Sequence, residues 1–107
     1  MTSGDRAGDE PAPFHDAFAD LAERARARNV RRAERVLELL GAPAVDADGR
    51  AEAAELLHAV TGSAGTFGQE ELSDAARHLA ALLRDGDGVA SGALDGLRRA
   101  ARGETSA

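Results

Sequence analysis

The chain of 107 residues has no cysteine, tryptophan, tyrosine or lysine, and all 13 of its basic residues are arginine. The absence of cysteine excludes disulfides, thiolate metal ligands and a thiol nucleophile. Because aromatic residues make up only 3% of the chain, the core has to be built from leucine, valine, alanine and three phenylalanines. The formal net charge of -6 argues against a general surface for nucleic acids or anionic membranes.

Long apolar runs are also missing. The N-terminal segment MTSGDRAGDEPAP is polar and acidic, unlike a secretory signal peptide, and no stretch approaches the ~20 apolar residues that cross a bilayer. We therefore expect a cytoplasmic protein with no membrane contact. The length suits one small domain, and the composition predicts disordered tails at residues 1–12 and 103–107 around a domain at residues 13–102.

Helical periodicity dominates the first half of the domain. Alanine, leucine, arginine and glutamate favour helices, and Pro13 suits the first turn of one. Two apolar stripes with helical spacing follow: Phe14, Phe18, Leu21 and Ala25, then Ala33, Val36, Leu37 and Leu40. The segment RARARNVRR between them fits either the solvated surface of one long helix or a bend near Asn29, so one helix and two both stay open.

Further helices are expected downstream. The turn-rich segment GAPAVDADGR predicts a helix that begins near Asp48 or Arg50. The segment QEELSDAARHLAALL has one apolar face and one polar face, the latter formed by Ser73, Asp74, Arg77 and His78. A shorter last helix carries Val89, Leu94 and Leu97. Amphipathic helices with short connectors predict an all-α fold, namely an antiparallel four-helix bundle in up-down-up-down order, with an N-terminal helix that is either intact or broken into an extra short segment.

The segment HAVTGSAGTFG, residues 58–68, places three glycines at a spacing of three behind a histidine. On a helix that advances roughly 100° per residue, Ala53, Leu56, Leu57, Val60, Ala64 and Phe67 share the buried arc. His58 then points outward among mostly small neighbours: Ala51, Ala54, Glu55, Thr61, Gly62 and Gly65. Each glycine inside a helix costs roughly 1 kcal/mol of stability relative to alanine, so we expect these glycines to have a compensating role. The bare face would let another backbone or a phosphoryl group approach the ring. Gly68 is expected to end the helix.

Three other kinds of site fit this chain poorly. A phosphate-binding loop would follow a strand and end in GK[ST], which GSAGTFG does not. The three histidines, His15, His58 and His78, lack the i, i+4 spacing of a metal pair, and His78 is expected to pair with Asp74 instead. Ser63 points away from His58 on the helical wheel, so no Ser–His nucleophile is expected.

The order of His58, Gly62, the small pair Ser63 and Ala64, and the closing Gly68 before an amphipathic helix resembles the histidine-containing phosphotransfer (HPt) domain of bacterial multistep phosphorelays. The motif covers about residues 50–84. The resemblance implies that His58 is the phosphoacceptor, that Gly62 leaves room for the incoming group and that Phe67 belongs to the core. The family usually has a lysine three residues after the histidine, where this chain has Thr61.

By the same resemblance the chain is a phosphoryl carrier and not an enzyme. Its partners would be response-regulator receiver domains and a hybrid sensor histidine kinase, with Mg²⁺ and the catalysis supplied by the partner and no cofactor or metal held by this chain. The docking surface around His58 would include Ala54, Glu55, Thr61, Gly62 and Gly65. The alternative is a helical interaction module that is not phosphorylated and binds a receiver or kinase, or dimerises; Thr61 keeps this alternative open.

Overall fold

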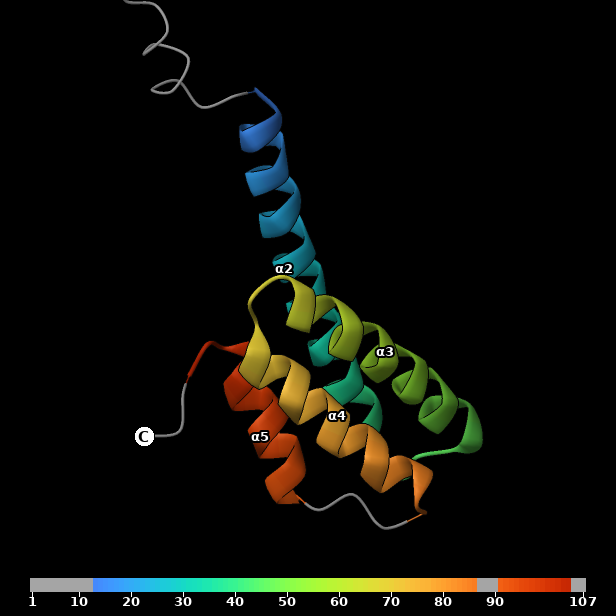
Figure 1. The fold of residues 1–107 in the computed structure, drawn as a ribbon. Helices are drawn as coiled ribbons and strands as arrows, with labels where there is room; N and C mark the ends of the chain where they lie inside the picture. The colour runs from blue at the N-terminus through green and yellow to red at the C-terminus, as the bar shows by residue number, and fades with distance from the viewer. Residues whose placement is uncertain (1–12, 87–90, 105–107) are drawn as a thin grey trace, which may run out of the picture.

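The computed structural model describes residues 13–86 and 91–104, which form four helices without a strand among them. The helices are α2 (Pro13–Leu40), α3 (Ala47–Thr66), α4 (Glu70–Arg84) and α5 (Ser91–Ala101), shown in Figure 1. The expected all-α class is therefore confirmed for these residues. The predicted tail at residues 1–12, the last three residues of the C-terminal tail and Val89 lie outside the described residues.

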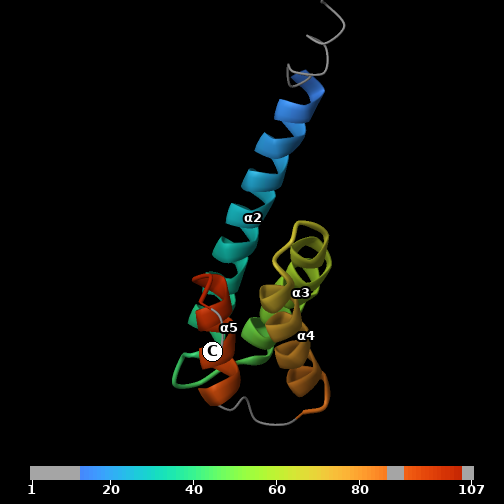
Figure 2. The same cartoon turned by 60° about the vertical axis from the view of Figure 1, so that its left-hand side comes forward.

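The N-terminal segment forms one unbroken helix, which answers the question left open at Asn29. The helix α2 has 28 residues, so its length is about 42 Å at 1.5 Å per residue. Its N-terminal part extends beyond the other three helices (Figures 1 and 2). The helix continues through Asn29, whose side chain is fully buried.

The core lies where the four helices meet. The helix α2 packs against α3 and α5, and α4 packs against the same two helices. The side chains buried together are Ala33, Val36, Leu40, Ala53, Leu57, Val60, Ala64, Leu72, Ala76, Leu79 and Leu97. Burial of each leucine or valine contributes roughly 1.5–3 kcal/mol, and the alanines between them allow the helices to approach closely without aromatic residues.

Phe67 is not part of this core, contrary to the expectation from the family pattern. The helix α3 ends at Thr66, and Phe67 occupies the C-cap with a half-buried side chain. Because Phe67 leaves the helical path, it no longer shares the buried arc of Ala64.

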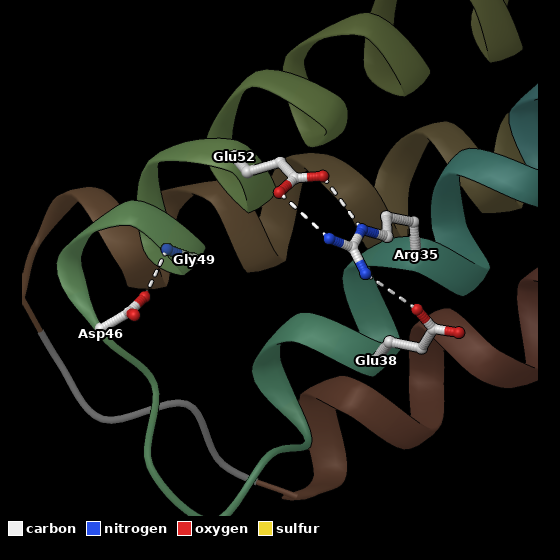
Figure 3. Close-up of polar contacts among 5 residues, drawn as sticks. All are labelled: Arg35, Glu38, Asp46, Gly49 and Glu52. Atoms are coloured by element: carbon white, nitrogen blue, oxygen red, sulfur yellow. Dashed lines mark hydrogen bonds and ion pairs between the residues drawn. The ribbon is translucent and has the colours of Figure 1, made fainter.

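The ends of α3 follow local signals. Asp46 is the N-cap of α3, and its Oδ1 accepts a 2.7 Å hydrogen bond from the Gly49 N–H (Figure 3). The helix therefore begins at Ala47, slightly earlier than predicted. At the other end, Gly68 has a φ of +84°, and the Gln69 N–H bonds to the Ala64 carbonyl at 2.8 Å. This left-handed glycine ends the helix as the sequence predicted.

An exposed ion pair joins α2 to α3 (Figure 3). Arg35 Nε lies 2.9 Å from Glu52 Oε2, and a second nitrogen of the same guanidinium lies 3.0 Å from Glu38 Oε1. The hydrogen bond from Arg35 lowers the pKa of Glu52, and the carboxylates raise the pKa of Arg35. Because these groups are solvent-exposed, the pair contributes little to the stability of the fold.

A buried polar cluster joins the middle of α2 to the turn between α3 and α4. Asn29 Nδ2 donates to Ser63 Oγ at 3.0 Å and to Gln69 Oε1 at 3.1 Å. Gln69 Nε2 in turn donates to the Arg26 carbonyl at 3.3 Å, and Asn29 Oδ1 accepts from Arg32 at 3.2 Å. The cluster satisfies the buried amide of Asn29, and it holds Ser63 against α2, away from His58.

Candidate functional site

His58 lies on the exposed face of α3, as the sequence predicted. Ala51, Ala54, Glu55, Gly62 and Gly65 are exposed with it, and Thr61 is half-buried. The opposite side of the helix is fully buried at Ala53, Leu57, Val60 and Ala64. The imidazole therefore projects from a well-packed helix whose outer face carries mostly small side chains.

The two glycines inside α3 have different surroundings. A Cβ added at Gly62 would meet no atom within 4 Å, so packing within the described residues does not require a glycine there. A Cβ at Gly65 would lie 3.5 Å from Ser73 Oγ, an ordinary contact with α4. Gly62 thus costs helix stability and leaves open space one turn beyond His58.

His58 also lines an open hollow of about 600 Å³ between α3 and α4, which we name the α3–α4 hollow. Alanines and arginines make up most of its lining. The lining residues are Arg50, Ala51, Ala54, His58 and Thr61 from α3, and Arg77, Ala80, Ala81, Leu83 and Arg84 from α4. Of the predicted docking residues, Ala54 and Thr61 lie in this lining, whereas Glu55, Gly62 and Gly65 lie on the exposed surface outside it.

The lining of the hollow carries positive charge. It includes three arginines and no aspartate or glutamate, although the whole chain has a formal net charge of -6 and Asp85, outside the lining, lies 3.9 Å from Arg84 Nε. Arg77 bonds to Asp74 at 2.8 Å, and Arg50 reaches the Leu83 carbonyl at 3.5 Å. Sequence reasoning did not single out these arginines as site residues, although Arg77 and Arg84 are seven apart and therefore share one face of α4.

The prediction that Ser73 lies on the outward face of α4 is wrong. Its side chain is only 3% exposed, and its hydroxyl donates to the Thr61 carbonyl at 2.8 Å. The helix α3 packs over this position, so a serine that looks solvent-facing on the helical wheel becomes a hydrogen-bonded contact between two helices. The Thr61 hydroxyl donates within its own helix, to the Leu57 carbonyl at 2.8 Å.

The remaining histidines take no part in this site. His78 is exposed on α4, and the partner of Asp74 is Arg77, not His78 as predicted. The side chain of His15 lies outside the described residues. Within the described residues no three histidine, aspartate or glutamate side chains gather closely enough to hold a metal ion.

No helix in the described part of the chain combines the length and apolarity that crossing a membrane requires. Comparison of the sequence and the fold with protein-family models, curated proteins and solved structures finds no match.

Proposed function

We propose that this protein is a cytoplasmic HPt carrier, an antiparallel up-down-up-down four-helix bundle that moves a phosphoryl group between receiver domains. The observation that carries the proposal is the exposed His58 in the middle of α3, next to a glycine position that opens directly to solvent. The motif resemblance and the positive lining of the α3–α4 hollow support the same function.

The chemistry needs a ring nitrogen of His58 to attack the phosphorus of an aspartyl phosphate on the donor receiver. An N–P bond forms while the acyl phosphate P–O bond breaks, and the aspartate leaves as a carboxylate. The reverse exchange passes the group to the aspartate of a second receiver. A neutral imidazole offers the required lone pair, and the receiver supplies Mg²⁺ and the in-line geometry.

The face around His58 suits close approach of a partner. Alanines and glycines there replace the long charged side chains that usually cover an exposed helix face. Arg50, Arg77 and Arg84 add charge that attracts an anionic aspartyl phosphate. Ala54, Glu55, Thr61, Gly62 and Gly65 form the docking surface in this proposal.

The test is transfer of radiolabelled phosphoryl from phosphorylated receivers, with acid-labile, alkali-stable label as the signature of phosphohistidine. We expect label on the wild-type protein and on His78→Gln, which alters another exposed histidine, but none on His58→Gln. Label that persists in His58→Gln would place the acceptor elsewhere.

The second candidate is an interaction module that binds a receiver or kinase without being phosphorylated. Thr61 favours it, because the hydroxyl bonds to the Leu57 carbonyl and brings no charge to the site. Stable binding to a receiver, together with no label from either a phosphorylated receiver or phosphoramidate, would establish this module in place of the carrier.

A further inference from the structure

The three arginines of the α3–α4 hollow do not lie equally close to His58. Arg50 reaches the Leu83 carbonyl, next to Arg84, so these two arginines occupy the same end of the hollow. Arg50 also precedes His58 by eight residues, which is about 12 Å along the helix axis. Thr61, in contrast, lies less than one turn from His58.

Arg77 lies at the Thr61 end of the hollow. Ser73 Oγ lies 2.8 Å from the Thr61 carbonyl oxygen, and Arg77 Nη2 lies 3.4 Å from that same Ser73 Oγ. Asp74 holds the other terminal nitrogen of Arg77 at 2.8 Å. The guanidinium is therefore attached from α4 beside position 61, where the chain has no cationic side chain of its own.

We infer, on the basis of the phosphotransfer function proposed above, that Arg77 binds the phosphoryl group on His58 and supplies the positive charge that Thr61 does not. The two hydrogen bonds to Asp74 and Ser73 use two of the five N–H donors of a guanidinium. The other donors can bind phosphate oxygens in the bidentate manner that distinguishes arginine from lysine. The cation is thereby supplied by the facing helix.

The exposure of Arg77 allows its guanidinium to bind the phosphoryl group when it arrives on His58 and to release it afterwards. Its side chain is 63% exposed, so the guanidinium can turn toward the phosphoryl group without disturbing the core. Asp74 keeps the arginine paired before the phosphoryl group arrives, and Ser73, which is buried, fixes the place from which it turns. The phosphoryl group carries close to two negative charges at neutral pH, which favour its replacement of Asp74 as the partner of the Arg77 guanidinium.

The test uses phosphoramidate, a small phosphoryl donor to histidine, and follows phosphohistidine on the full chain by ³¹P NMR. We expect Arg77→Ala to slow the formation of phosphohistidine about tenfold, the scale of one lost charge-assisted hydrogen bond. Arg98→Ala is the matched control, because Arg98 pairs with Asp95 in the same i, i+3 geometry on α5. It should stay within about twofold of wild type.

The double variant Arg77→Ala, Thr61→Lys separates charge from structure. If Arg77 acts by its charge beside His58, a lysine at position 61 restores most of the lost rate, whereas a structural defect would persist. Equal rates for Arg77→Ala and wild type, or no rescue by the lysine, would overturn the role of Arg77 while leaving His58 as acceptor. A wild-type protein that forms no phosphohistidine would overturn the carrier function itself and this role with it.

Discussion

Gly62 gives the most direct test of how stability and function are divided in α3. The residue lies inside the helix without a positive φ, and a Cβ there would meet no atom within 4 Å. Gly62→Ala should therefore stabilise the protein by the helix-propensity difference, about 1 kcal/mol. For a domain of this size that corresponds to an increase in Tm of about 4 °C or more.

Phosphotransfer should respond in the opposite direction as the side chain at position 62 grows. Gly62→Leu keeps the helix folded but fills the space that the docking receiver needs, so we expect transfer to fall at least tenfold. The control is Gly96→Ala in α5, where a Cβ also meets nothing within 4 Å. It should raise the Tm to a similar extent and leave transfer unchanged.

The assays are thermal unfolding by circular dichroism and label transfer from a phosphorylated receiver. A drop in Tm for Gly62→Ala would show that the glycine is required by packing, which contradicts the open surroundings of that position. Wild-type transfer by Gly62→Leu would show that the bare face of α3 is not where the partner docks.

Two further perturbations test the contacts that hold α3 in place. Asn29→Leu keeps the side-chain volume but leaves the acceptor atoms of Ser63 and Gln69 without their donor. The free energy of unfolding in urea should therefore fall by about 1–3 kcal/mol. An unchanged value would mean that the cluster contributes nothing to stability. Glu52→Gln removes the ion pair with Arg35, which lowers the pKa of Glu52 from its ordinary 4.5. The stabilisation by this pair is present above pH 4.5 and is lost as the pH falls through the lowered pKa. The Tm values of variant and wild type should therefore differ slightly at pH 7 and converge in strongly acidic buffer. A difference that grows in acid would refute the assignment.

The sequence by itself determined the helices and the direction of His58. Apolar residues at helical spacing leave one face of α3 to be buried, so the opposite position has to face water. Gly68 ends that helix for a local reason, because a glycine readily adopts the left-handed conformation found at φ +84°. These features depend on neighbours within a few turns, which is why periodicity and capping predicted them.

Only the tertiary structure decided how segments distant in sequence meet. The burial of Asn29 depends on Ser63, 34 residues away, and the burial of Ser73 depends on α3 packing across it. The arginines of the α3–α4 hollow come from two helices, and a helical wheel of either one does not show that they line one hollow together with His58. Whether an added Cβ meets open space, as at Gly62, is likewise set by the packing of neighbouring helices, which no local pattern encodes.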